Sequence, residues 1–102
     1  MSTTPEGKIK QKLRAKLRTL PKCYVFMPVQ TGLGASTLDY LGCVNGHFVA
    51  IETKAPRMVM TARQQVVMHE ILEAGGYVFL VDSEEAIDQC IARLALLSKF
   101  GP

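Results

Sequence analysis

The stretch that decides the fold is LDYLGCVNGHFVAIETK, residues 38–54, in which two apolar runs flank Asn45 and Gly46. An Asn-Gly pair between apolar runs predicts a β-hairpin with a two-residue turn, because both residues tolerate the left-handed backbone that such a turn needs. We therefore expect one strand over residues 38–44 and a second over residues 47–54. Ala55-Pro56 ends the second strand, since proline has no amide hydrogen to donate to a neighbouring strand.

The same turn fixes which residues of the two strands face each other. With Val44 opposite His47, counting outward places Asp39 opposite Glu52 on one face of the sheet, with Cβ atoms about 4.5–5.5 Å apart. Lys54 lies two residues beyond Glu52 and therefore shares that face. The hairpin thus predicts a cluster of two carboxylates and one amine.

Two like charges opposed in a sheet destabilise it, so this pair needs a compensating positive charge. A divalent cation is one solution, because Mg²⁺ takes oxygen ligands from one or two carboxylates together with water and phosphate. Lys54 acting as a structural counterion is the other solution, and the residues by themselves allow both.

The segment before the hairpin predicts a helix and a strand. Thr4-Pro5-Glu6 is typical of a helix start, with a cap residue, proline in the first turn and an acid near the positive end of the helix. Pro21 ends this helix, and residues 23–30 follow as a strand in which Pro28 indicates an edge or a bulge. The helix carries one apolar stripe of Ile9, Leu13, Leu17 and Leu20.

The segment after the hairpin predicts a helix, a strand and a last helix. Thr61 caps a helix that runs to about residue 74 and ends at Gly75-Gly76, and residues 77–82 form a short apolar strand. Ser83 caps the last helix. The order is α-β-β-β-α-β-α, which predicts an α/β fold with a mixed sheet flanked by helices. The second hairpin strand and the strand at 77–82 should be parallel, joined by a right-handed crossover.

Composition predicts one soluble domain over residues 1–102. Hydrophobic residues make up 48% of the chain, which is enough for a core. Six of the twelve Lys and Arg residues fall within 8–18, and six of the nine Asp and Glu residues fall within 70–88. A basic stripe on the first helix suits a polyanion such as DNA, and a solvated helix face is the alternative interpretation.

The cysteines and the hydropathy pattern predict a cytoplasmic protein. The three cysteines are far apart and form no C-x-x-C motif, which argues against a zinc finger or a thioredoxin-type site and favours free thiols in a reducing compartment. We find no apolar stretch of membrane-spanning length and no apolar core of a signal peptide near the N-terminus. We therefore expect no membrane partner.

Several short motifs, taken in order, resemble a nuclease family. Glu52-Thr53-Lys54 follows apolar Val49-Ala50-Ile51, with Asp39 one hairpin earlier, which is similar to the PD-(D/E)XK signature. More narrowly, the chain resembles the VRR-NUC group, although Leu38 stands where the signature has proline and no Val-Arg-Arg triplet is present. The motifs that carry this resemblance are Gly34-x-x-x-x-Asp39, Asn45-Gly46, Ile51-Glu52-Thr53-Lys54, Thr61-x-x-Gln64 and Gly75-Gly76.

The resemblance implies a restriction-endonuclease-like core and a Mg²⁺-dependent deoxyribonuclease, with Mn²⁺ as a substitute metal. Asp39 and Glu52 would ligate the metal, and the backbone carbonyl of Thr53 would add a third oxygen. Lys54 would orient or deprotonate the attacking water, or stabilise charge that develops on the phosphate.

Two further residues have both a possible catalytic role and a purely structural one. Glu6 matches an acid early in the family's first helix, and its structural role would be to stabilise the helix dipole. Gln64 matches a glutamine near the catalytic lysine, whereas Thr61-x-x-Gln64 is also a capping box. Gln65 is the alternative to Gln64 if the register slips by one residue. Gly32 and Gly34 are turn residues that would also allow the backbone to approach a phosphate.

The expected partner is DNA, with the protein acting as a homodimer. No element for reading bases in a groove is evident, so we expect structure-selective cutting of branched DNA such as a Holliday junction. The last helix, with Leu94, Leu96 and Leu97, is a candidate dimer interface. A non-catalytic DNA-binding module and a protein-interaction subunit are the alternatives. The candidate DNA contacts are Arg57, Arg63, Lys8, Lys12 and Arg14.

Overall fold

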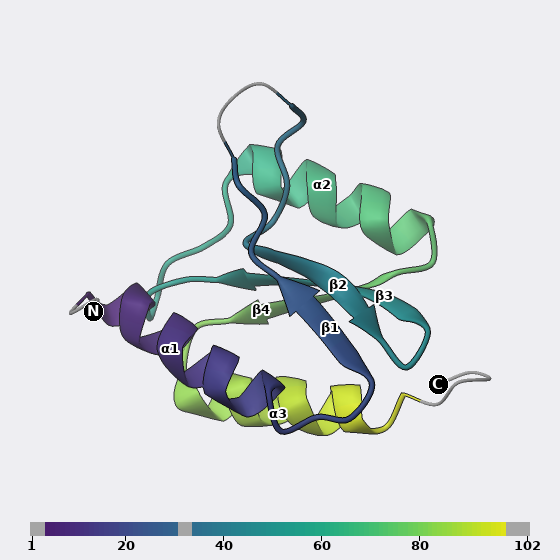
Figure 1. Ribbon diagram of the computed structural model, residues 1–102. Helices are drawn as coiled ribbons and strands as arrows, with labels where there is room; N and C mark the ends of the chain where they lie inside the picture. Colours follow the sequence, from purple (N-terminus) through teal and green to yellow (C-terminus); the bar gives the residue numbers. More distant parts are fainter. Residues whose placement is uncertain (1–3, 31–33, 98–102) are drawn as a thin grey trace.

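The predicted element order is confirmed by a computed structural model that describes residues 4–30 and 34–97 (Figure 1). Gly32 lies outside these ranges. None of the described helices is long and apolar enough to cross a membrane. The elements are α1 (Pro5–Leu17), β1 (Cys23–Phe26), β2 (Tyr40–Val44), β3 (His47–Thr53), α2 (Ala62–Glu73), β4 (Tyr77–Val81) and α3 (Glu84–Ala95).

The four strands form one mixed sheet in the order β1-β2-β3-β4. The pairs β1–β2 and β2–β3 are antiparallel, and β3–β4 is parallel as the crossover predicts. The predicted hairpin register is confirmed, with Val44 opposite His47 and Tyr40 opposite Ile51. Asn45 and Gly46 have φ values of 48° and 91°, the left-handed conformations that the two-residue turn requires.

All four strands are shorter than the sequence predicts: β3 and β4 each end one residue early, at Thr53 and Val81, and the larger differences in β1 and β2 lie at the same end of the sheet. β1 ends at Phe26 instead of residue 30, so Pro28 lies outside the ladder. β2 begins at Tyr40 instead of Leu38. The backbone pairing of β1 with β2 therefore ends before Asp39 is reached. Beyond that point the backbone amides of Asp39 and Thr53 donate to side-chain oxygens.

The helices cover the two faces of the sheet unequally. Figure 1 shows α1 and α3 side by side on one face and α2 alone on the other. Ile9, Leu13 and Leu17 of α1 pack into the larger core with the odd-numbered residues of β3, whereas Ala50 belongs to the smaller core under α2. Period-two alternation along β3 therefore sends Glu52, two residues after Ala50, toward the α2 side.

The end of the last helix is not the apolar surface that we expected. Leu94 and Leu97 are 1% and 8% exposed and belong to the core of the chain itself, while Leu96 is 73% exposed. The prediction of a three-leucine interface is therefore wrong for two of its three members. Leu94 and Leu97 instead belong to the apolar stripe that packs the end of the chain into the larger core.

Candidate active site

Asp39 and Glu52 meet where β2 and β3 separate, and each side chain binds the other strand. The Asp39 amide donates to Glu52 Oε1 at 3.0 Å. The Thr53 amide and the Thr53 hydroxyl both donate to Asp39 Oδ2, at 3.0 and 2.6 Å. The strand ladder thus ends in a pair of carboxylates that replace the next backbone acceptors, so the predicted Asp39–Glu52 cluster is present.

Glu52 is held from the other side by α2 and by Lys54. It is 2% exposed, and its Oε2 atom accepts a hydrogen bond from Gln64 Nε2 at 2.7 Å. Lys54 Nζ lies 3.5 Å from the same oxygen. The cluster predicted from the hairpin therefore includes its amine.

Gln64 closes the predicted capping box and also contacts the carboxylate cluster. Its side-chain oxygen accepts from the Thr61 amide at 2.9 Å, and the Gln64 amide donates to Thr61 Oγ1 at 3.2 Å, which completes a capping box. Its side-chain nitrogen remains available for Glu52. The start of α2 therefore orients a residue of the carboxylate cluster. Gln65, the alternative, donates to the Met60 carbonyl instead.

α1 contributes a cation that the sequence analysis did not assign to the site. Lys10 Nζ lies 3.1 Å from Glu6 Oε2 and 4.0 Å from Asp39 Oδ2, so it connects the helix to the carboxylate pair. Among the described ion pairs, Glu6 reaches the cluster through Lys10. The four-residue spacing of Glu6 and Lys10 was a signal for their pairing but not for the contact with Asp39.

The electrostatics of the cluster favour a cation at Glu52. Burial raises the pKa of Glu52, and the charge of Asp39 raises it further, whereas the Asp39 amide and Lys54 act in the opposite direction. Burial acts to lower the pKa of Lys10, but its hydrogen bond to Glu6 and the charges of Asp39 and Glu6 outweigh burial, so the pKa is raised. The charged Glu52 carboxylate is thus under-compensated by the residues around it.

The raised pKa of Glu52 predicts how the stability of the metal-free protein depends on pH. In the folded chain the Glu52 carboxyl keeps its proton at pH values above its ordinary pKa of 4.5. Protonated Glu52 therefore adds to the free energy of unfolding below pH 4.5, and this contribution is lost as the pH rises through the pKa of the folded state. Carbon-13 NMR titration of the Glu52 carboxyl in EDTA should give a midpoint above 4.5, and Asp39→Asn should lower it. A midpoint at or below 4.5 in wild type would contradict this account.

The donor set fits a hard cation with few protein ligands. No group of three or more His, Cys, Asp or Glu side chains suited to a metal gathers within residues 4–30 and 34–97. A closed zinc site needs four such ligands, whereas Mg²⁺ takes one or two carboxylates and completes its shell with water and phosphate. Asp39 and Glu52 meet that requirement, and a role for the Thr53 carbonyl stays a prediction.

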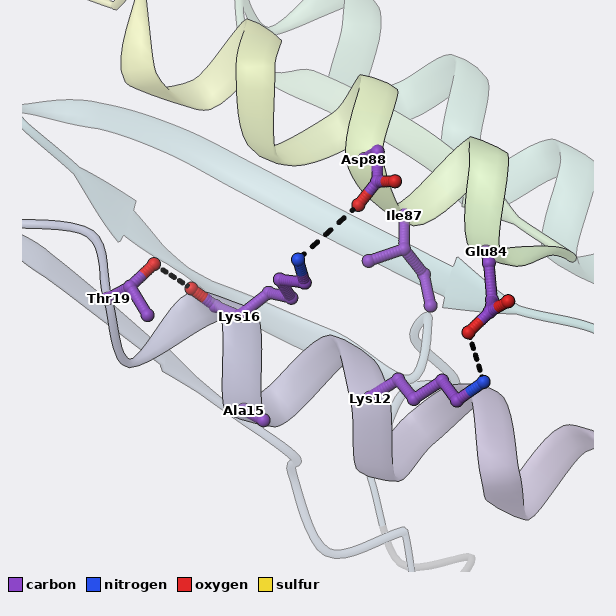
Figure 2. Close-up of a pocket in the computed structure, with 7 residues that line it drawn as sticks. All are labelled: Lys12, Ala15, Lys16, Thr19, Glu84, Ile87 and Asp88. Carbon is purple, nitrogen blue, oxygen red and sulfur yellow. Dashed lines mark hydrogen bonds and ion pairs between the residues drawn. The ribbon is translucent and has the colours of Figure 1, made fainter.

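The basic residues of α1 divide between two flanks of the helix. Figure 2 shows Lys12 and Lys16 beside a hollow between α1 and α3, where Lys12 pairs with Glu84 and Lys16 Nζ lies 3.7 Å from Asp88. Lys12, a predicted DNA contact, therefore points toward α3 and not toward Asp39 and Glu52. The remaining predicted contacts, all exposed, are Lys8, Arg14, Arg57 and Arg63.

Comparison with known proteins identifies a solved structure with the same fold. No protein-family model and no curated protein sequence matches the chain. A solved structure described as a VRR_NUC domain superimposes with a TM-score of 0.75 and 21% sequence identity, over 88% of this chain and 97% of that one. The chain therefore has the α/β fold of a VRR_NUC domain, with element order α-β-β-β-α-β-α.

Proposed function

We propose that this protein is a Mg²⁺-dependent deoxyribonuclease that hydrolyses phosphodiester bonds at the Asp39–Glu52–Lys54 cluster. The observation that carries the proposal is the meeting of these three side chains at the separation of β2 and β3, on a fold shared with a VRR_NUC domain. That fold is of the PD-(D/E)XK nuclease type, whose signature residues these three match. Phosphodiester hydrolysis needs charge neutralisation, an activated water and a positioned phosphate.

Each residue of the cluster has a defined task in this proposal. Asp39 and Glu52, with the Thr53 carbonyl, would hold Mg²⁺, which supplies charge neutralisation and a more acidic water. The Lys54 amine lies beside them and orients or deprotonates the water, or stabilises charge on the phosphate oxygens.

The surrounding residues keep the two carboxylates in position. The Gln64 side-chain nitrogen donates to one oxygen of Glu52, and the hydroxyl and backbone amide of Thr53 donate to one oxygen of Asp39. These contacts leave the remaining lone pairs of both carboxylates for a metal. Glu6 acts through Lys10, whose charge lies beside Asp39.

Two other functions are compatible with the fold. A non-catalytic DNA-binding module would have no use for the buried Glu52 carboxylate opposite Asp39, since two opposed carboxylates destabilise a sheet. A protein-interaction subunit would bind its partner with weak salt dependence, whereas DNA binding weakens steeply with salt. The two opposed carboxylates therefore favour the nuclease.

We propose branched DNA, such as a four-way junction, as the substrate, and a homodimer as the active form. No described helix projects from the domain as a reader of bases, which favours recognition of shape over sequence (Figure 1). A two-fold dimer presents two active sites to two strands. Sedimentation velocity at the assay concentration should give the mass of two chains, and a single-chain mass would refute the dimer.

The decisive experiment is cleavage of labelled duplex, flap and four-way-junction DNA. We expect cutting with Mg²⁺ or Mn²⁺, no cutting in EDTA, and a preference for the junction. Glu52→Ala should abolish cutting while keeping DNA binding, since the metal loses a ligand but the basic surface is unchanged. Wild-type binding without cutting in either metal would favour the binding module. No binding at all would favour the protein-interaction subunit.

A further inference from the structure

One flank of α1 carries two arginines that have no ion-pair partner within residues 4–30 and 34–97. Glu6, Lys10, Arg14 and the cap residue Arg18 follow one another at four-residue spacing, so they lie along one side of the helix. Lys10 is paired with Glu6 and Asp39. Arg14 and Arg18 form no ion pair with any residue that the structure describes. Their positive charge is therefore available to a ligand.

These arginines line a hollow that adjoins the carboxylate cluster. A hollow of about 240 Å³ lies between α1 and β1, lined by Arg14 and Arg18 together with Phe26, Met27 and Tyr40. A second hollow shares Arg14 and Met27 with the first and continues to Glu6 and Lys10. We call the two together the α1 groove. Because Lys10 lies beside Asp39, the α1 groove leads away from the proposed site of hydrolysis.

Tyr40, which lines the α1 groove, has a buried hydroxyl group without a hydrogen-bond partner among the described residues. The side chain as a whole is 2% exposed. Buried hydroxyls are normally satisfied, so an unpaired one calls for a ligand or a functional reason. Burial raises the pKa of Tyr40, the charges of Arg14 and Lys10 act in the opposite direction, and the charge of Asp39 raises it further. Tyr40 and Arg14 line the same hollow.

We propose that the α1 groove binds a second phosphate of the DNA strand being cut, using Arg14, Arg18 and the Tyr40 hydroxyl. The inference rests on the proposed function, because it takes the reacting phosphate to lie at Asp39 and Glu52. Guanidinium groups recognise phosphate oxygens through paired hydrogen bonds, and a hydroxyl adds a third donor. Arg14 and Tyr40 line the same hollow, so both side chains belong to one phosphate site in this proposal. This contact positions the strand in line with the site of hydrolysis.

Binding of labelled four-way-junction DNA, followed by fluorescence anisotropy in EDTA, tests the groove without any cleavage. Arg14→Gln should weaken binding roughly tenfold and lower the slope of log affinity against log salt by about 1. Arg93→Gln removes the same charge from exposed α3 and should change neither quantity. Tyr40→Phe should weaken binding without lowering the melting temperature, because it deletes an unsatisfied buried hydroxyl. Tyr24→Phe, at an exposed hydroxyl, is its control.

A walk of single methylphosphonate linkages along the DNA identifies the contacted phosphate. At one position the neutral linkage should weaken wild-type binding about as much as Arg14→Gln does, and should weaken the variant no further. Equal additive losses at every position, or Arg14→Gln binding like Arg93→Gln, would overturn the inference. Cleavage by wild type with no effect of Arg14 would leave the nuclease standing and refute the groove. DNA binding that depends on Arg14, without any cleavage, would support the phosphate site in the α1 groove and refute the nuclease.

Discussion

Lys54→Met is expected to reduce the rate of DNA cleavage by about 10²–10⁴-fold, the usual contribution of a positioned acid, base or charge donor. The Lys54 amine lies 3.5 Å from Glu52 Oε2, and methionine fills a similar volume without the charge. Lys54 is only partly buried, so this substitution leaves the core intact. Initial rates on junction DNA in Mg²⁺ measure the effect.

The matched control for this variant is Lys16→Met, which removes the same charge from α1 beside α3. Lys16 pairs with Asp88 at the surface, and such exposed pairs contribute about 0–1 kcal/mol to stability. We expect Lys16→Met to cut DNA at close to the wild-type rate. If Lys54→Met retains more than about a tenth of wild-type activity, Lys54 is a structural counterion of Glu52 and has no part in the chemistry.

Gly42→Ala is expected to destabilise the protein by about 3 kcal/mol or more, because the added methyl group has no space. A Cβ atom on Gly42 would lie 2.0 Å from the Tyr24 carbonyl oxygen and 2.5 Å from the Val25 Cα atom. Both are backbone atoms of β1, which cannot turn aside as a side chain does. The substitution therefore forces β1 away from β2, which also opens the α1 groove along its β1 wall.

Gly34→Ala provides the control, since a Cβ atom there would meet nothing within 4 Å. Urea denaturation should show a lower midpoint for Gly42→Ala with an unchanged slope, and little change for Gly34→Ala. A Gly42→Ala variant within about 0.5 kcal/mol of the control would mean that β1 does not approach β2 as closely as described.

The hairpin explains why so much of the fold follows from the sequence. Asn45-Gly46 fixes the turn, the turn fixes the register, and the register brings Asp39 and Glu52 together. These steps are local, and each depends on residues that are close in the chain. Chain reversals at Pro21 and Gly75 and the caps at Thr61 and Ser83 act locally in the same way, so the order of elements could also be predicted.

The missing details depend on contacts between distant segments or on the failure of a regular pattern. Alternation places Thr53 on the opposite face from Glu52, yet its hydroxyl reaches Asp39 because Asp39 lies just outside β2, where strand geometry ends. Lys10 could be placed beside Asp39 only once the packing of α1 on the sheet was known. The pairing of Lys12 with Glu84 joins residues that are 72 positions apart.

The packing of α1 against α3 has a consequence for the timing of activity during translation. α1 carries Glu6 and Lys10, but its apolar stripe packs into a core that includes Ile87 and Leu94 of α3. While α3 is still inside the ribosome, the nascent chain already contains Asp39, Glu52 and Lys54. At that stage α1 lacks the apolar residues of α3 against which it packs. The contact of Lys10 with Asp39 is therefore secured only when the last helix folds, so incomplete chains lack an assembled carboxylate cluster.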